Sequence, residues 1–426
     1  MAKQASIRPI VAILICINSI IGAGLFINPR PLTQFAGPYG FLVYLLGALL
    51  LTPLILSIAE LAKLHPVAGG LYVYSKTYLG RAAGFLSAWA YFLGKTVTVA
   101  ILMYKFVQFF QPRVPVLADI PTLAIAFTLI FIFALLNIAG LAVGGRVQYL
   151  FVTLKATPVI FTLLMGAYCF DVVHFYEAVN PVGVFTALPT AIFALLSFEV
   201  ICAIGNQIED AKNNIKRVIL TSFFTVATIN TLFQLAMFGG VGADLVSSNE
   251  PILTLGLKAL SAYPMIGHFI NGVVFTSILG GFFSIMTSNC WNLHTLANND
   301  HFPLKKWLTK TNKNNVPWVS LLVEASLGCG ILLITVQQTP LQNMSVFAQL
   351  ISFLLAIVAA CYAVLSGALK KLPLAIPLVA ILSCFLVLGI SLHRIVTSGL
   401  SFSFLGVFAF GCLAAAAQYV QARNGR

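Results

Sequence analysis

Charged residues are scarce in this sequence. Lys, Arg, Asp and Glu make up 8% of its 426 residues, whereas 60% of the residues are hydrophobic. Soluble globular domains carry about 25% charged residues, so the composition excludes a soluble protein. It predicts a chain that crosses a lipid bilayer many times.

Motifs for metal binding, disulfide formation and catalysis are also missing. The eight cysteines are scattered through apolar stretches without a C-x-x-C pair, which favours a role as small buried hydrophobes over a zinc site or a disulfide framework. There is no H-E-x-x-H motif and no paired-Asp motif of the kind that a membrane-embedded enzyme would use. We therefore expect no catalytic residue, no metal and no cofactor. A channel, which would more often be built from a repeated pore-lining ring, is less favoured than a carrier.

The sequence does contain a long series of apolar runs, separated by polar residues, Gly and Pro. Each run is close to the roughly 20 residues that a transmembrane helix needs. We expect about twelve spans in a single all-α transmembrane domain, residues 1–426. The approximate limits of spans 1 to 12 are 9–30, 38–62, 82–111, 121–140, 147–170, 183–205, 218–241, 263–292, 317–336, 343–366, 373–392 and 398–420. After span 2, paired glycines and an aromatic amphipathic stretch predict a short helix along the cytoplasmic face.

The basic residues are unevenly distributed between the two sides of the predicted domain. With the N-terminus in the cytoplasm, seventeen of the 24 Lys and Arg residues fall in cytoplasmic segments, four fall outside and three lie within spans. This positive-inside pattern predicts a multi-pass protein of the cell membrane with both termini in the cytoplasm. The net charge of +13 follows from this topology, so no nucleic acid is expected as a partner.

Span 1 carries an unusual segment of small residues, Ile21-Gly22-Ala23-Gly24, at its centre. Each Gly costs about 1 kcal/mol of helix propensity relative to Ala. Two interpretations are open. The small residues let a neighbouring helix pack closely, or the helix is interrupted here and the free N–H groups of its second half bind a substrate carboxylate.

Span 6 also carries non-helical and charged residues at depth, in the segment Ser197-Phe198-Glu199. Spans 1 and 6 are five apart, and because five is odd, two five-span halves would have opposite orientations in the membrane. Interrupted segments at corresponding places in two such halves indicate a transport site. We expect inverted repeats at residues 9–170 and 183–366, followed by additional helices at 373–420.

Glu199 in span 6 and Lys155 in span 5 are charged residues deep in the predicted spans. Intramembrane charges are functional candidates because each costs several kcal/mol unless it is paired or hydrated. Glu199 either takes up a proton during transport, holds the mobile span in one state, or forms a structural hydrogen bond to a freed N–H group. Lys155 lies about 13 Å beyond Arg146 along a helix. Lys155 either snorkels back to the cytoplasm or replaces a bound cation and carries a proton.

Further polar residues occur in spans 3 and 9. Tyr91 and Lys95 are one helical turn apart in span 3 and share a face. Lys95 would either meet an acidic substrate side chain or pair with a buried Glu. Glu324 in span 9 would either pair with another span or face a partner subunit.

Several motifs, taken in their order, resemble the amino acid–polyamine–organocation (APC) transporters. The resemblance extends over roughly residues 8 to 305. Length and span count are similar to those of the bacterial arginine/agmatine, lysine/cadaverine and putrescine/ornithine antiporters. The matching segments are Ile21-Gly22-Ala23-Gly24-Leu25-Phe26, Ala36-Gly37-Pro38, Ala59-Glu60-Leu61, Ala68-Gly69-Gly70, Phe198-Glu199, Glu209-Asp210-Ala211-Lys212-Asn213-Asn214-Ile215 and Leu296-Ala297-Asn298-Asn299-Asp300-His301-Phe302-Pro303.

The resemblance implies a LeuT-like fold of five plus five inverted spans with broken spans 1 and 6. In such transporters the Gly-rich break of span 1 binds the substrate carboxylate, and carbonyl groups of span 6, here at Phe193, Leu196 and Ser197, bind the α-ammonium. A lysine at the place of Lys155 replaces a sodium ion in several members, and the Glu at Glu199 matches one implicated in proton sensitivity. The family usually has Gly where this chain has Ser197.

These observations predict a sodium-independent secondary transporter of amino acids or related amines, a permease or antiporter that works by alternating access. The alternative is a proton-coupled symporter or exchanger for an acidic or neutral amino acid, because Lys95 would repel a dibasic substrate. The expected partners are an amino acid or polyamine, the lipid bilayer and protons, and a homodimer is left open. The expected substrate-binding residues are Ile21, Gly22, Ala23, Gly24, Tyr91, Lys95, Phe193, Leu196 and Ser197, and the expected coupling residues are Lys155 and Glu199.

Overall fold

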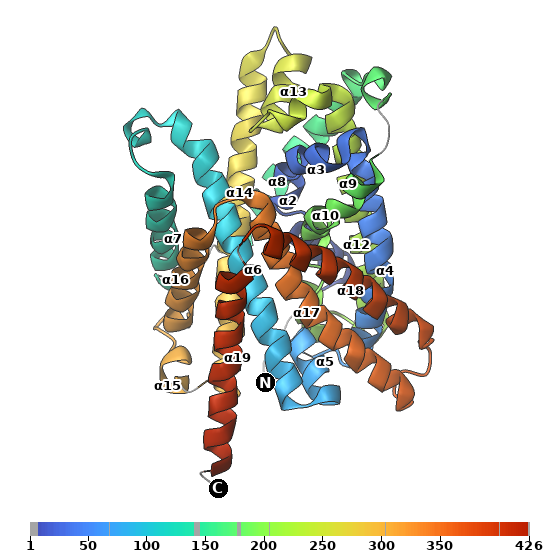
Figure 1. Ribbon diagram of the computed structural model, residues 1–426, viewed down its shortest axis with the longest axis vertical. Helices are drawn as coiled ribbons and strands as arrows, with labels where there is room; N and C mark the ends of the chain where they lie inside the picture. Colours follow the sequence, from blue (N-terminus) through green and yellow to red (C-terminus); the bar gives the residue numbers. More distant parts are fainter. Residues whose placement is uncertain are drawn as a thin grey trace. The chain divides into compact units, whose positions relative to one another are not determined.

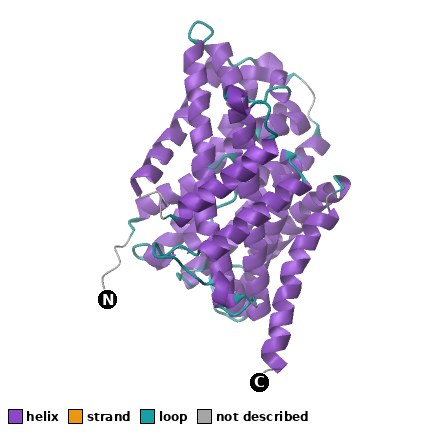
Figure 2. Cartoon of the chain, turned by 90° about the vertical axis from the view of Figure 1, so that its left-hand side faces the viewer, coloured by secondary structure: helices purple, strands orange, loops and turns teal. Residues whose placement is uncertain are grey.

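The chain folds almost entirely into helices (Figures 1 and 2). Within the part of the chain that the structure describes, the only β-type contact is a bridge between Ile7 and Ile208. The all-α architecture predicted from the apolar runs is therefore confirmed. The structure, a computed structural model, describes residues 7–67, 69–139, 145–176, 180–203, 205–302, 304–399 and 401–424.

The helices follow one another along the chain with short connections. The α-helices are α1 (Pro9–Ile20), α2 (Gly24–Ile27), α3 (Pro29–Ala36), α4 (Gly40–Leu64), α5 (Gly70–Leu79), α6 (Arg81–Phe110), α7 (Thr122–Ile138), α8 (Gly145–Tyr168), α9 (Pro181–Thr186), α10 (Leu188–Leu195), α11 (Val200–Ala203), α12 (Ala211–Val241), α13 (Pro251–Ala259), α14 (Pro264–Asn298), α15 (Lys305–Leu308), α16 (Trp318–Ile334), α17 (Gln338–Leu365), α18 (Ala375–Thr397) and α19 (Ser401–Asn424). The short 3-10 helices are η1 (Gly37–Tyr39), η2 (Gln111–Arg113), η3 (Pro115–Leu117), η4 (Val172–Phe175), η5 (Gly205–Gln207) and η6 (Gly242–Val246).

The long apolar helices agree with the predicted spans. In the described ranges, seven helical segments are long and apolar enough to cross a membrane, and five shorter apolar helices accompany them. Each of these segments coincides with one of the predicted spans, which confirms a polytopic membrane protein. A short helix is also found where it was expected after span 2, as α5.

Proline and glycine mark the ends of several helices. Pro9, Pro29 and Pro251 each begin a helix, because their fixed φ suits the first turn and their missing N–H has no helical partner to lose. Gly37, with φ of 55°, ends α3. Helices α3 and α13 were not predicted from the sequence, since they lie between spans and are too short to appear as apolar runs.

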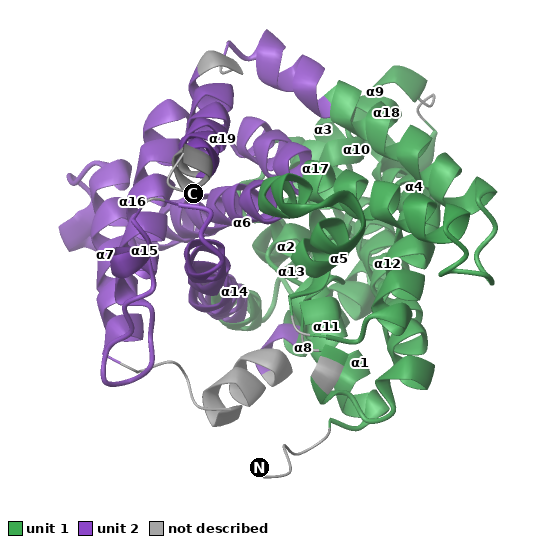
Figure 3. Ribbon diagram, turned by 90° about the horizontal axis from the view of Figure 1, so that it is seen from below, with its two compact units in different colours: residues 1–87, 156–272, 350–390 green, residues 88–155, 273–349, 391–426 purple. Residues whose placement is uncertain are grey.

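The chain divides into two compact units (Figure 3). Unit 1 comprises Met1–Ser87, Ala156–Gly272 and Leu350–Ile390. Unit 2 comprises Ala88–Lys155, Val273–Gln349 and Ser391–Arg426. Each unit brings together segments that are far apart in sequence.

The core of unit 1 forms around α12, which packs along both α4 and α1. Phe198 is fully buried there and stacks on Phe353 with ring centroids 5.4 Å apart. An ion pair between Lys216 and Glu60, 2.5 Å from Nζ to Oε1, joins the ends of α12 and α4. Glu60 exposes only 12% of its side chain, so this pair is less screened by solvent than an ordinary surface pair.

The core of unit 2 contains the helical residues of α6 that follow Ser87. Trp89 stacks on Phe92 with ring centroids 5.6 Å apart, and its indole N–H donates to the Phe408 carbonyl of α19 at 3.1 Å. Helix α17 approaches α6 closely at Gly94, where an added Cβ would lie 2.9 Å from the carbonyl oxygen of Ser345. The Ser345 hydroxyl donates to the Gly94 carbonyl at 3.0 Å, so Gly94 is required for this contact.

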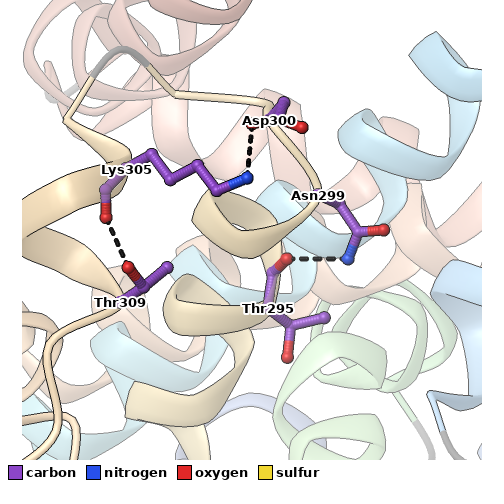
Figure 4. A network of polar contacts seen from close by, with 5 residues as sticks. All are labelled: Thr295, Asn299, Asp300, Lys305 and Thr309. Atoms are coloured by element: carbon purple, nitrogen blue, oxygen red, sulfur yellow. Dashed lines mark hydrogen bonds and ion pairs between the residues drawn. The ribbon is translucent and has the colours of Figure 1, made fainter.

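The connection after α14 in unit 2 is ordered by local polar contacts (Figure 4). Asn299 donates to the Thr295 carbonyl at 2.9 Å, and Lys305 pairs with Asp300 at 2.8 Å. Both members of the ion pair are about half exposed, so it stabilises the fold by less than about 1 kcal/mol. These contacts fit a solvated connector between spans 8 and 9.

Candidate functional site

Span 1 is interrupted at residues 21–23. Helix α1 ends at Ile20 and α2 begins at Gly24. The N–H group of Ile21 still donates to the Ile17 carbonyl at 2.8 Å, as in a helix. The N–H group of Gly22 instead donates to the Ile20 carbonyl, at 2.7 Å. In α2, the N–H groups of Phe26 and Ile27 donate to the Ala23 carbonyl at 2.9 and 3.0 Å. The first two N–H groups of a helix that begins at Gly24, by contrast, have no acceptor within it. Among the described residues, the N–H groups of Gly24 and Leu25 have no backbone acceptor elsewhere either.

The two glycines of span 1 have different roles. An ideal Cβ built on Gly24 would lie 2.8 Å from the Cβ of Ala194 in α10, so Gly24 allows a close helix contact. A Cβ on Gly22 would meet only the Ile20 carbonyl oxygen, at 3.8 Å, so packing does not require Gly22. Both interpretations of the small-residue segment therefore apply, the close contact to Gly24 and the interruption to Gly22.

Span 6 is interrupted at residues 196–199. Helix α10 ends at Leu195, Leu196 is extended, and α11 begins at Val200. Ser197 has φ of 88°, in the left-handed region that costs a residue with a Cβ about 1 kcal/mol or more. The last carbonyl groups of α10 have no donors from a following helical turn, because the chain turns away at Leu196. The Ser197 carbonyl accepts a long hydrogen bond of 3.4 Å from Val200.

The two interruptions lie in unit 1, and the helices next to them contact each other. Gly24 of α2 touches Ala194 of α10, and the thiol of Cys16 in α1 donates to the Phe198 carbonyl at 3.8 Å. Helix α1 also packs on α11. Most neighbouring residues are buried, whereas Ile21, Gly22, Phe193 and Ser197 are partly exposed.

Sequence reasoning missed Asn28, which lies directly after α2 and is completely buried. Its side-chain amide donates to the Thr190 carbonyl of α10 at 2.7 Å and to the Tyr44 hydroxyl of α4 at 3.2 Å. One amide thus joins the second half of span 1 to the first half of span 6 and to span 2. The sequence feature that could have revealed this residue is an Asn inside the first apolar run, directly before Pro29.

Glu199 lies at the second interruption and exposes 4% of its surface. Its carbonyl accepts the N–H groups of Cys202 at 2.9 Å and Ala203 at 3.3 Å, so Glu199 begins the first turn of α11. The thiols of Cys16 and Cys202 are its neighbours in unit 1. No group of three His, Cys, Asp or Glu side chains that could hold a metal ion occurs in the described ranges.

Three of the predicted residues belong to unit 2. Tyr91 and Lys95 lie one turn apart on α6, with the Lys95 ammonium 5.2 Å from the centre of the Tyr91 ring. Lys95 exposes 6% of its surface and Lys155, on α8, exposes 9%. Burial to this extent is unusual for lysine unless its charge is compensated. The other predicted residues, Ile21 to Gly24, Phe193, Leu196, Ser197 and Glu199, are together in unit 1.

Glu324 pairs with another span, which was one of its two expected roles. It is fully buried on α16, and its Oε1 accepts a hydrogen bond of 2.9 Å from the side-chain amide of Asn289 on α14.

The site in unit 1 offers hydrogen-bond donors and acceptors that the helices themselves do not use. Donors come from the start of α2 and acceptors from the end of α10, and the two helix ends meet at Gly24 and Ala194. Interrupted helices that meet inside a multi-pass helical protein are typical of secondary transporters.

Sequence comparison makes this class more specific. The amino acid permease family matches residues 8–416, and the chain belongs to that family, within the APC superfamily that the motifs predicted.

Individual relatives are distant but cover much of the chain. The lysine-specific permease LysP of Lactococcus lactis subsp. cremoris (strain MG1363) is 25% identical over 74% of this chain, and the match spans 66% of that protein, just under two thirds. The amino-acid permease RocE of Bacillus subtilis (strain 168) is 27% identical over 74% of this chain and 70% of its own length. The serine/threonine exchanger SteT of the same organism is 24% identical over 82% of this chain and 81% of its own length. LysP and SteT are named for different amino acids, and the name of RocE specifies none.

Proposed function

We propose that this protein is a sodium-independent secondary transporter that carries an amino acid or a related amine by alternating access. The observation that carries the proposal is the contact between the two helix ends that flank the interruptions in unit 1, at Gly24 of α2 and Ala194 of α10. Membership of the amino acid permease family supports the substrate class. The distribution of basic residues supports a location in the cell membrane with both termini in the cytoplasm.

The substrate carboxylate is assigned to the segment Ile21 to Gly24. The N–H groups of Gly24 and Leu25 have no backbone acceptor among the described residues, and N–H groups at the start of a helical segment are suited to binding an anion. An unpaired N–H group in an apolar environment costs roughly 2 kcal/mol or more, so hydrogen bonds from these N–H groups would stabilise a bound carboxylate.

The substrate α-ammonium is assigned to carbonyl groups at the end of α10, those of Phe193, Leu196 and Ser197. An ammonium group has three donors, which suits a cluster of carbonyl oxygens. The hydrogen bond that the Ser197 carbonyl accepts from Val200 is long, at 3.4 Å, and therefore weak. The short distance between the carboxylate and the ammonium of an amino acid matches two helix ends in contact.

Coupling is assigned to Lys155 and Glu199, and side-chain selection to Tyr91 and Lys95. The buried ammonium of Lys155 would replace the cation that sodium-dependent carriers require, and Glu199, next to the second interruption, would take up and release a proton. The burial of Lys95 favours a second candidate, a proton-coupled carrier of an acidic or neutral amino acid, because a buried ammonium repels a dibasic substrate.

Counterflow in proteoliposomes tests the proposal. Vesicles loaded with an unlabelled amino acid should accumulate the same labelled amino acid transiently, with saturation, and replacing sodium by choline should leave the rate unchanged. The screen should include acidic, neutral and basic amino acids and polyamines, with and without a pH gradient. Flux that does not saturate, or that stops without sodium, would contradict the proposal.

A second test addresses coupling. Lys155→Ala should lower uptake about tenfold or more, or flatten its pH dependence, because the compensating charge is lost. Lys258→Ala is the matched control, since Lys258 is an exposed lysine of α13. Wild-type uptake and pH dependence in Lys155→Ala would remove Lys155 from the mechanism.

A further inference from the structure

Unit 2 contains a buried amide that contacts two other helices. Asn289 of α14 exposes 1% of its surface. Its Nδ2 lies 2.9 Å from Oε1 of Glu324 on α16. The same Nδ2 lies 3.2 Å from the Phe92 carbonyl oxygen and 3.2 Å from the Thr96 hydroxyl, both on α6. One side chain therefore connects spans 3, 8 and 9.

The contacted turn of α6 is the one on which Tyr91 and Lys95 lie. Within it, the Thr96 hydroxyl donates to the Phe92 carbonyl at 2.9 Å. That carbonyl thus receives hydrogen bonds from Thr96 and from Asn289, and such side-chain bonds bend a helix locally. Asn289 therefore fixes the shape of the turn between residues 92 and 96.

The orientation of Asn289 is itself determined by two neighbours. The amide of Asn292 donates to Oδ1 of Asn289 at 3.0 Å, which leaves Nδ2 facing α6 and Glu324. In the described part of the chain, Glu324 has no Lys or Arg partner, and its Oε2 has no hydrogen bond. An ionised carboxylate without a cation is very costly at full burial, so Glu324 serves as a neutral acceptor.

We propose that Asn289, oriented by Glu324, is a positioning residue that holds the turn of α6 carrying Tyr91 and Lys95 in the geometry required for substrate selection. The inference rests on the proposed function, in which these two residues contact the substrate side chain. The Asn289–Glu324 pair acts through its hydrogen bond, and Glu324 carries no transported proton.

Transport kinetics of single variants test the proposal. Asn289→Ala should raise the KM for the preferred amino acid about tenfold, corresponding to the loss of one or two hydrogen bonds, and should change the ratio of acidic to neutral substrates transported. The maximal rate should stay within about twofold of wild type. Thr96→Val, which keeps the side-chain shape, should raise KM about threefold by removing one acceptor.

Variants of Glu324 separate hydrogen bonding from charge. Glu324→Gln keeps an acceptor oxygen and should behave like wild type in KM and selectivity, whereas Glu324→Ala should behave like Asn289→Ala. The matched control is Asn137→Ala. Asn137 is equally buried, and its Oδ1 accepts a hydrogen bond of 2.7 Å from Thr287 on the same helix, α14. This control should change thermal stability but neither KM nor selectivity.

The outcomes are distinct. If Asn289→Ala and Thr96→Val both kept the KM of wild type, the positioning role would be overturned. It would also be overturned if Asn137→Ala raised the KM as much as Asn289→Ala does. If Glu324→Gln raised the KM as much as Glu324→Ala does, the negative charge of Glu324 would be required, and its role as a neutral acceptor would be overturned. If wild-type protein shows no saturable amino acid exchange, the proposed function fails, whatever the variants do.

Discussion

The interruptions of spans 1 and 6 have different local causes, although the helix ends beside them contact each other. Span 1 contains two glycines close together. Packing requires Gly24 but does not require Gly22, which precedes it. In span 6, the chain turns through Ser197 at φ of 88°, where a Cβ is strained. The first interruption is therefore conformationally inexpensive, and the second stores strain.

This difference shows that a helix can be broken by sequence or by surroundings. Glycine residues lower the helix propensity of span 1 wherever that span is placed. Ser197 has no such effect, and its backbone is held by neighbours, such as buried Phe198 stacked on Phe353. Substitutions at the two places should consequently have opposite effects on stability.

The largest effect is expected from Gly24→Leu. A side chain at this position collides with Ala194, and overpacking of this kind costs about 3 kcal/mol. The variant should unfold at clearly lower temperature in detergent and transport nothing. Gly22→Leu should unfold at the same temperature as wild type, because little lies near the added Cβ. Substrate should no longer raise the unfolding temperature of this variant.

The measurement is a thermal unfolding curve with and without saturating amino acid. If Gly22→Leu were stabilised by substrate as strongly as wild type, the carboxylate site would not be at this interruption. Equal stability of Gly24→Leu and Gly22→Leu would remove the distinction between the two glycines.

A smaller and opposite effect is expected from Ser197→Gly. Removing the Cβ relieves the strain at positive φ, so the variant should be more stable by about 1 kcal/mol, after the entropy cost of a glycine is included. Ser197→Ala, which keeps the Cβ, is the control and should not gain stability. A destabilised Ser197→Gly would mean that the hydroxyl, and not the backbone, determines the effect of this residue.

The smallest effect is expected outside both interruptions, at His65 between α4 and α5. Its ring nitrogen shares a hydrogen bond of 2.9 Å with the Tyr78 hydroxyl, and partial burial lowers the pKa of His65. Because the unfolded chain then binds the proton more readily, the folded protein loses stability as the pH falls below about 6.5.

The test compares wild type with His65→Gln between pH 7.5 and pH 5.5, roughly one unit on either side of the ordinary histidine pKa. The unfolding temperature of wild type should fall about 1 °C more than that of the variant. Identical curves would show that His65 does not contribute to acid sensitivity.

The fold and the first interruption could be predicted because their signals are local. Apolar runs of sufficient length give spans, and Gly22 and Gly24 weaken a helix by themselves. The second interruption could be predicted from its place five spans later and from the charge of Glu199. The roles of Lys155 and Glu199 stay predictions.

The remaining contacts depend on tertiary structure. That Gly24 meets Ala194, or that Glu324 accepts a hydrogen bond from Asn289, requires knowing which helix faces which. The positive φ of Ser197 was also not readable, since serine normally avoids it. Buried Asn28 went unnoticed because a single Asn at the end of an apolar run looks like a boundary residue.

The three-way contact of Asn28 has a consequence for local opening. Breakage of its hydrogen bonds to Thr190 and Tyr44 costs a buried amide favourable contacts, so α2, the start of α10 and the adjoining part of α4 should lose amide protection together. The backbone bridge from Ile7 to Gln207 and Glu209 similarly connects the chain before α1 with the chain after α11. Hydrogen exchange should therefore reveal two cooperative blocks on opposite sides of the interruptions, each built from one half of both broken helices.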